Sequence, residues 1–175
     1  SLFAFNNLKN WAKGKNDQQL NYNFLLYEFR ILIQQNNNKL DSITELKLLN
    51  FINSKNIEKF KYIRTDALFL LACSYFNKKQ YALAMRYHYS AHEMYSKYVV
   101  NEFPHLEDYY YEYGRIYYFF KDFKKAASIY KEAWKAVPSH KFQSGRATRM
   151  NTLALCFKSM NQFDSAIYYF SKAQK

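Results

Sequence analysis

The chain has 175 residues, of which 49% are hydrophobic and 21% aromatic, and its formal net charge is +12. With only 3 Gly and 2 Pro it lacks the tight turns of a β-sandwich or barrel, and no apolar run is long enough to span a bilayer. The basic residues are scattered, which is typical of a solvated surface, although an excess of this size also suits an acidic partner or nucleic acid.

Residues 1–64 contain apolar segments with helical spacing. A short helix is predicted near residues 2–13. Residues 21–35 are so densely apolar that they predict a largely buried helix. Residues 54–62 are a charged bridge that could hold a short helix from Ile57 to Phe60.

A second helix of this region is predicted over residues 41–53. It begins at Asp41 or Ser42, and Ser42 with Glu45 has the spacing of a capping box. The side chains expected to be buried on it are Leu46, Leu49 and Phe51.

Three later segments repeat one arrangement of small and aromatic residues in two helical stripes. They cover about residues 65–98, 107–140 and 147–175, and the first is expected to open at Thr65 or Asp66. The small residue of the first stripe recurs at intervals of 42 and 40 residues, as Ala72, Gly114 and Ala154. Such a helix pair cannot bury its apolar face alone, so the pairs are expected to stack.

The best-formed copy lies between Tyr110 and Pro138. Its first stripe consists of Tyr110, Tyr113, Gly114 and Tyr117. After a polar break at Lys121 and Asp122, its second stripe consists of Phe123, Ala126, Tyr130 and Ala133. Glycine costs roughly 1 kcal/mol in a helix interior relative to alanine, so Gly114 predicts a close helix crossing.

This order resembles the tetratricopeptide repeat (TPR), whose signature is W-x2-L-G-x2-Y…A-x3-F…P. Tyr110 stands at the Trp position and Gly114 at the Gly position, whereas His88 replaces an aromatic residue in the first copy. The resemblance implies an all-α fold, a TPR-type right-handed superhelix of antiparallel helix pairs. Residues 65–175 would form one continuous solenoid, and residues 1–64 a degenerate helical repeat.

In this family the first helix of each unit lines a concave groove, so the resemblance implies a protein- or peptide-binding module. Similar arrays occur in bacterial signalling regulators, which favours a sensor or scaffold segment of a larger protein, soluble and either cytoplasmic or periplasmic. A free-standing adaptor for complex assembly and a basic nucleic-acid-binding helical repeat are the alternatives. The predicted groove residues are Phe69, Cys73, Phe76, Asn77, Tyr111, Arg115, Tyr118, Phe119, Asn151, Leu155 and Lys158.

Chaperone-binding members of the family hold a C-terminal carboxylate with Lys, Arg and Asn at fixed groove positions. None of the matching positions is basic here, which argues against a chaperone tail as the ligand. These positions hold Phe69, Cys73, Glu112, Thr148 and Thr152.

Candidate chemistry is sparse. His88 and His92 share one helix face, but no third ligand is evident, so we expect no metal site. Cys156 sits in an apolar helical pattern without a catalytic motif, and no phosphate-binding glycine motif occurs. The sequence therefore predicts neither an enzyme nor a cofactor.

The last predicted helix is crowded with aromatic residues. Tyr168, Tyr169 and Phe170 stand where a terminal helix normally needs a polar outer face. We expect either further protein sequence or a homodimer to cover this end.

Overall fold

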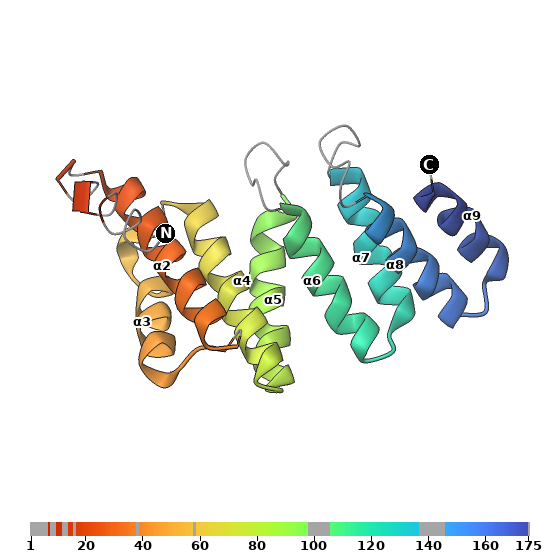
Figure 1. Ribbon diagram of the computed structural model, residues 1–175, viewed down its shortest axis with the longest axis horizontal. Coiled ribbons are helices and arrows are strands. Elements are labelled where there is room, and N and C mark those ends of the chain that lie inside the picture. The colour runs from red at the N-terminus through yellow and green to blue at the C-terminus, as the bar shows by residue number, and fades with distance from the viewer. Residues whose placement is uncertain are drawn as a thin grey trace. The chain divides into compact units, whose positions relative to one another are not determined.

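Figure 1 shows a computed structural model of the chain, which describes residues 7, 10, 11, 14, 15, 17–37, 39–57, 59–97, 106–136 and 146–174. All regular elements in these residues are helices, so the predicted all-α class is confirmed. The chain divides into two compact units, residues 1–87 and residues 88–175. The helix predicted near residues 2–13 lies largely outside the described residues, as do Pro104 and Pro138.

The described helices fall into two successions, one in each unit. The first unit contains α2 (Gln18–Gln35), α3 (Ser42–Ile52), the 3-10 turn η1 (Lys55–Ile57), α4 (Lys61–Asn77) and the start of α5 (Tyr81–Tyr95). The second unit contains the end of α5, α6 (Leu106–Phe119), α7 (Phe123–Ala136), α8 (Arg146–Ser159) and α9 (Phe163–Ala173). None of the helices in the described part of the chain is both long and apolar enough to cross a membrane.

In the first unit, α2 and α3 pack against α4 through apolar stripes. Leu26, Phe29 and Ile33 are the buried side chains of α2, and their i, i+3, i+7 spacing places them on one face. The ring of Phe29 lies 6.2 Å from the ring of Phe51 on α3, where Leu48 is also fully buried. Burying a side chain of this size contributes about 1.5–3 kcal/mol.

The start of α3 corrects one sequence prediction. Asp41 is the N-cap, since its Oδ1 accepts a hydrogen bond of 2.9 Å from the amide of Thr44. Glu45 does not reach back to form a capping box with Ser42. Its Oε1 instead accepts a hydrogen bond of 2.6 Å from the hydroxyl of Tyr75, a residue of α4.

The buried stripe of α3 also differs from the prediction. Leu46 is 60% exposed and Leu49 is half-buried, whereas Leu48 and Ile52 are buried together with the expected Phe51. Both sets have helical spacing, and the sequence alone does not show which set faces α2 and α4.

The start of α4 is a third correction, because this helix begins at Lys61 and not at Thr65 or Asp66. Both polar residues are buried inside the helix and are satisfied there. The hydroxyl of Thr65 donates to the carbonyl of Lys61 at 2.8 Å, and Asp66 forms an ion pair with Arg30 of α2. The short helix predicted from Ile57 to Phe60 is replaced by η1, which ends at Ile57.

One turn occurs three times and accounts for the repeat seen in the sequence. It connects α4 to α5, α6 to α7 and α8 to α9, each time with one residue in the left-handed region. These residues are Lys79 (φ 63°), Lys121 (φ 63°) and Asn161 (φ 58°). In each turn the following amide donates over 2.9 Å to a carbonyl five residues earlier, in the pairs Gln80–Tyr75, Asp122–Tyr117 and Gln162–Phe157. This hydrogen bond ends the first helix of each pair in the same way, so the chain enters the second helix with the same backbone geometry in all three turns.

Gly114 has the packing role that the sequence predicts. A Cβ atom built at this position would lie 2.5 Å from Cε1 and 2.7 Å from Cζ of Tyr130, a contact too short for real atoms. The Tyr130 ring of α7 therefore packs directly on the backbone of α6. Ala126, on the same stripe of α7, is fully buried.

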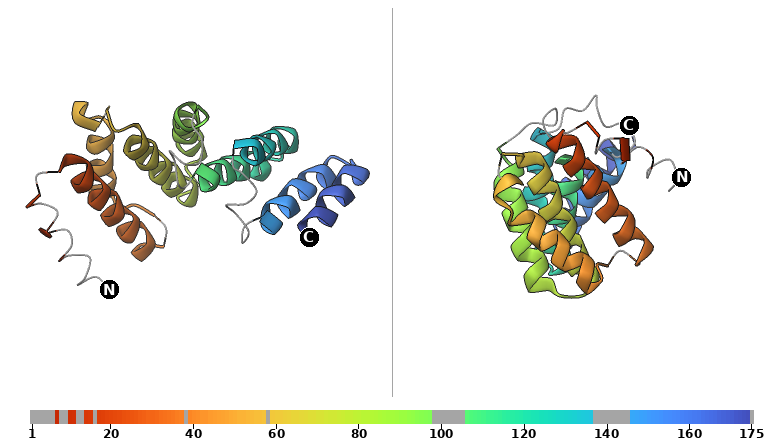
Figure 2. Two further views of the ribbon diagram at one scale, coloured as in Figure 1. Left: turned by 90° about the horizontal axis from the view of Figure 1, so that it is seen from above. Right: turned by 90° about the vertical axis from the view of Figure 1, so that its left-hand side faces the viewer.

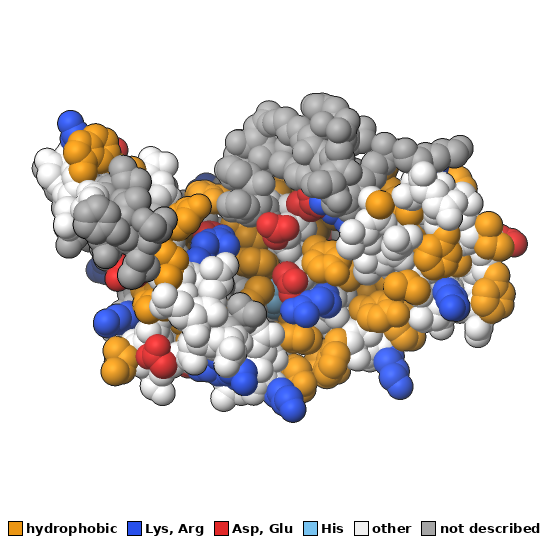
Figure 3. Space-filling model, in the orientation of Figure 1, with side chains coloured by type: hydrophobic (Ala, Val, Ile, Leu, Met, Phe, Trp, Pro, Cys, Tyr) orange, Lys and Arg blue, Asp and Glu red, His pale blue; other side chains and the backbone are white. Residues whose placement is uncertain are grey.

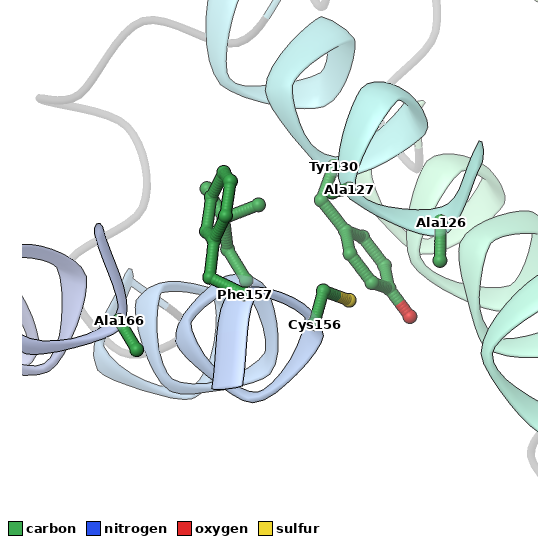
Figure 4. Close-up of a cluster of buried hydrophobic side chains, with 7 residues drawn as sticks. Ala126, Ala127, Tyr130, Cys156, Phe157 and Ala166 are labelled. Atoms are coloured by element: carbon green, nitrogen blue, oxygen red, sulfur yellow. The ribbon is translucent and has the colours of Figure 1, made fainter. Parts of the chain in front are cut away.

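The core of the second unit continues from α7 into α8 and α9. Figure 4 shows Tyr130 and Ala127 of α7 facing Cys156 and Phe157 of α8. Ala166 of α9 joins the same cluster, and α8 and α9 run side by side in Figure 2. A domain boundary after residue 64 and a continuous solenoid over residues 65–175 stay predictions.

Candidate partner-binding face

Seven of the predicted groove residues lie in the second unit, on the first helices of two successive helix pairs. They are Tyr111, Arg115, Tyr118 and Phe119 of α6, and Asn151, Leu155 and Lys158 of α8. On each helix the spacing is i, i+4, i+7, with i+8 added on α6, so each set shares one helix face. We call the two sets together the α6–α8 face.

Four members of the α6–α8 face are exposed. The side chains of Phe119 and Leu155 are 52% and 39% exposed, which is high for large apolar residues. Asn151 and Lys158 are exposed on the same face of α8 as Leu155. The face therefore offers apolar contact area beside an amide and an ammonium group.

The two tyrosines of the α6–α8 face are half-buried. The ring of Tyr111 lies 6.1 Å from the ring of Tyr130, and the ring of Tyr118 lies 5.2 Å from the ring of Phe123. Both tyrosines pack against the core cluster of α7, α8 and α9. They combine a structural role with a partly accessible ring edge.

Arg115 is held by an acidic neighbour on its own helix. Its Nε donates a hydrogen bond of 2.7 Å to Oε2 of Glu112. Burial raises the pKa of the Glu112 carboxyl, and the nearby guanidinium partly offsets that shift. The side chain of Arg115 remains 41% exposed, so it can still meet a ligand.

The other four predicted groove residues lie on α4 in the first unit and are less accessible. Phe69 is buried, with 7% of its surface exposed. Cys73, Phe76 and Asn77 are half-buried, and the ring of Phe76 lies 5.6 Å from that of Tyr81. These residues offer little contact area, and a groove shared with the α6–α8 face stays a prediction.

The positions that would hold a chaperone tail make internal contacts instead. Glu112 accepts from Arg115, and the hydroxyl of Thr152 donates to the carbonyl of Thr148 at 2.8 Å. Side chains used in this way, without a basic group among them, do not form a carboxylate clamp.

The two histidines of α5 face tyrosines of α6. His88 is 1% exposed, and burial together with the nearby Arg115 lowers its pKa to about 3, so it is neutral. Nε2 of His92 lies 3.5 Å from Oε2 of Glu132, and its ring lies 4.9 Å from that of Tyr113. No group of three or more His, Cys, Asp or Glu able to hold a metal ion occurs in the described residues.

Cys156 is fully buried in the α7–α8 core, and burial raises the pKa of its thiol to about 12. A thiol in this state is not a nucleophile at neutral pH. Its contacts with the core cluster make it a packing residue.

An ion pair that the sequence did not reveal connects the two helices of the face. Glu107 at the start of α6 is 5% exposed and pairs with Arg149 of α8. Burial lowers the pKa of the Arg149 guanidinium to about 10. The partners are 42 residues apart, so no local spacing signals the pair, which depends on how α6 and α8 pack.

Comparison with known families identifies the central helix pair. Residues 107–139 match the sequence model of the tetratricopeptide repeat family. The matched segment includes α6, the turn at Lys121 and α7, which confirms the predicted resemblance for the best-formed copy.

Two crystal structures of the protein MamA are similar to most of the chain. One is 16% identical and covers 97% of this chain and 90% of that chain, with a TM-score of 0.50. The other is 17% identical and covers 91% of each chain, also with a TM-score of 0.50. A comparison with curated protein sequences gave no match. The structural likeness shows the fold, and together with the repeat match it supports a protein-interaction module.

Proposed function

We propose that this chain binds a protein or peptide ligand and that the α6–α8 face is its contact surface. The observation that carries the proposal is the exposure of Phe119 and Leu155, 52% and 39%, on the first helices of successive pairs. Large apolar side chains at such positions provide the contact area that recognition requires, and Asn151 and Lys158 supply polar contacts beside them.

The ligand that suits this face is an extended peptide or a single helix. The apolar residues would take an aliphatic or aromatic side chain of the ligand. The amide of Asn151 would bond a ligand backbone, while Lys158 would favour a carboxylate. Arg115 is already paired with Glu112, so its contribution would be smaller.

The test is to select binders from a displayed random-peptide library on the immobilised chain. The affinity of the selected peptides is then measured for the parent chain and for the double variant Leu155→Asp, Lys158→Glu. This variant places acidic groups on the face. We expect a loss of affinity of about ten-fold or more, equal to about 1.4 kcal/mol. The matched control is Lys124→Glu with Ser128→Asp, two exposed positions of α7. Equal loss in both variants, or none in either, would contradict the assignment.

The biological setting that we propose is a sensor or scaffold segment in a larger bacterial signalling or regulatory protein. The support is the likeness to arrays of that kind described above, and a free-standing adaptor is the alternative. The reading frame after Lys175 distinguishes the two settings. A long continuation into a kinase or DNA-binding module is expected, and a stop codon at that point would contradict it.

A second copy of the chain is the partner that we propose for the outer stripe of α9. Phe163 and Ile167 are 57% and 63% exposed and lie four residues apart, so they face the same side. Light scattering of the chain and of Ile167→Glu tests this, with a dimer expected for the first and a monomer for the second. A monomer in both samples would reject self-association.

A further inference from the structure

A pocket of about 320 Å³ lies between α7, α8 and α9. Its walls carry three lysines, three large aromatic side chains and two buried aliphatic ones. They are Lys131, Trp134 and Lys135 of α7, Met150 and Leu153 of α8, and Tyr168, Tyr169 and Lys172 of α9. The pocket lies entirely within the second unit, so its geometry does not depend on the first.

This pocket is separate from the α6–α8 face. On α8, Met150 and Leu153 line the pocket, whereas Asn151 and Leu155 belong to the face. With about 100° between successive residues, the pocket positions are turned by about 80° or more from the face positions. A ligand could therefore occupy each surface independently.

The three lysines of the pocket lack the acidic partners that other basic residues of this chain have. Arg30, Lys78, Arg115 and Arg149 each pair with a carboxylate. Lys131, Lys135 and Lys172 form no ion pair within the described part of the chain, and no carboxylate lines the pocket. The pocket thus carries uncompensated positive charge in a concave apolar site, which strengthens its field toward an anion.

The ring contacts favour a protein ligand over single-stranded nucleic acid. Tyr169 stacks on Phe157 at 5.3 Å with an interplanar angle of 2°, and the ammonium of Lys172 lies 4.9 Å from the ring centre of Tyr168. One face of each tyrosine is thereby occupied. Nucleic-acid binding needs open rings on which successive bases stack. An apolar side chain needs only the floor made by Met150 and Leu153.

We propose that the pocket binds an acidic linear segment of a partner protein, in which one large apolar side chain is flanked by Asp or Glu. The apolar side chain would enter between Trp134 and Tyr168, and the carboxylates would meet the three lysines. A volume of about 320 Å³ is at the small end of ligand pockets, which suits one anchoring side chain better than a folded surface.

The experiment uses a fluorescein-labelled synthetic peptide with one Phe between flanking Asp and Glu residues. Anisotropy is measured at low salt with the whole chain and with the pocket variant Lys131→Glu, Lys172→Glu. The matched control is Lys124→Glu, Lys125→Glu, which makes the same charge change at two exposed positions of α7 outside the pocket. We expect an affinity loss of about ten-fold or more in the pocket variant and about two-fold or less in the control.

Three further measurements make the result specific. The chain has two tryptophans, so Trp11→Phe leaves Trp134 as the sole reporter, and its emission is expected to change when the peptide binds. Replacing the Phe of the peptide with Ser is expected to weaken binding. Leu155→Asp, on the α6–α8 face, is expected to leave the affinity for this peptide unchanged. That result would distinguish the pocket from the surface proposed above for ligand binding. Circular dichroism verifies folding, and Lys131→Gln with Lys172→Gln replaces the charge reversal if that variant unfolds.

Several results would overturn the proposal. Absence of binding at low salt would exclude the site. Equal losses in the pocket variant and the control would indicate general attraction to a basic protein. Tighter binding of an oligo-uridylate, lost in the same pocket variant, would assign the pocket to nucleic acid instead.

Discussion

In the first unit, α2 and α4 are connected by the ion pair between Arg30 and the buried Asp66, whereas in the second unit α6 and α7 meet where the Tyr130 ring packs on Gly114. The lengths of the links between successive helices also differ between these two regions. Three residues connect α6 to α7, whereas six residues separate α2 from α3. The small residue of α6 lets it pack on α7 by shape, whereas a buried polar pair joins α2 to α4. The second unit uses such a pair as well, between Glu107 of α6 and Arg149 of α8.

Breaking the ion pair is expected to have the largest effect. Arg30→Ala leaves the carboxylate of Asp66, which is 3% exposed, without its main cation. We expect a loss of about 2–3 kcal/mol in the free energy of unfolding, measured with urea, because an uncompensated buried charge is costly. The control is Arg115→Ala, whose partner Glu112 lies on the same helix, with an expected loss of about 0.5 kcal/mol. Similar losses in both variants would contradict the difference between the two regions.

The shape-based contact is tested by adding one carbon. Gly114→Ala gains about 1 kcal/mol in helix propensity but forces the Tyr130 ring to move, and overpacking costs about 1–3 kcal/mol. We expect a net loss of up to about 2 kcal/mol by thermal unfolding, because a Cβ atom 2.5 Å from the ring is a severe overlap. Gly14→Ala is the control, since among the described residues its Cβ would meet only the carbonyl oxygen of Trp11, at an ordinary 3.4 Å. A Gly114→Ala protein as stable as the parent would show that this crossing is not tight.

The same contact predicts that the Tyr130 hydroxyl is dispensable. This hydroxyl is buried and has no hydrogen-bond partner among the described residues. Removing an unsatisfied buried polar group costs nothing in bonding, so Tyr130→Phe is expected to be neutral or stabilising. It therefore separates the role of the ring from the role of the hydroxyl.

Acid is expected to weaken the second unit through His88. Burial lowers the pKa of His88 from 6.5 to about 3, so the unfolded chain takes up the proton first. Stability is complete above pH 6.5 and decreases as the pH falls below that value toward about pH 3, with a loss of about 1 kcal/mol expected by pH 5.5. Urea unfolding at pH 7 and pH 5.5 should show this loss.

His88→Phe provides the control for the acid effect. It restores an aromatic residue at a repeat position and removes the titrating group, so most of the acid sensitivity should disappear. His92 adds a smaller effect of the same sign, because burial lowers its pKa too. Equal acid sensitivity in the parent and the variant would show that His88 does not titrate as described.

The helix pairs of the repeat were predictable from the sequence because their small residues report close packing. Gly114 is informative in this way, because a glycine in a helix interior predicts a close neighbour, and that neighbour is Tyr130. In contrast, the sequence could not tell Leu46 from Leu48 on α3, since both fit a helical stripe. The side of α3 that is buried depends on where α4 packs, and the local sequence of α3 carries no information on that.

The ion pairs and the lysine pocket were missed for a related reason. In the sequence Asp66 has the residue type of a helix cap, whereas in the structure it lies inside α4 and pairs with Arg30. Lys131, Lys135 and Lys172 are ordinary surface lysines in the sequence and form one site only because α7 and α9 both flank α8. The spacing of Lys131, Trp134 and Lys135 at i, i+3, i+4 was the local signal available.

The smallest expected effect is on thiol chemistry. Cys73 on α4 is half-buried, whereas Cys156 is fully buried, and burial raises the pKa of its thiol to about 12. A thiol reagent at pH 8 should modify Cys73 in the native chain and both cysteines only in denaturant. Rapid native modification of Cys156 would mean that the α7–α8 core opens readily.

The central claim is that a ligand binds the α6–α8 face. Hydrogen–deuterium exchange tests this claim most directly. The chain is compared with and without a peptide selected from the random library. We predict slower exchange in residues 108–119 of α6 and 148–159 of α8, with little change in α4. Protection confined to α7 and α9, or no protection at saturating peptide, would contradict the claim.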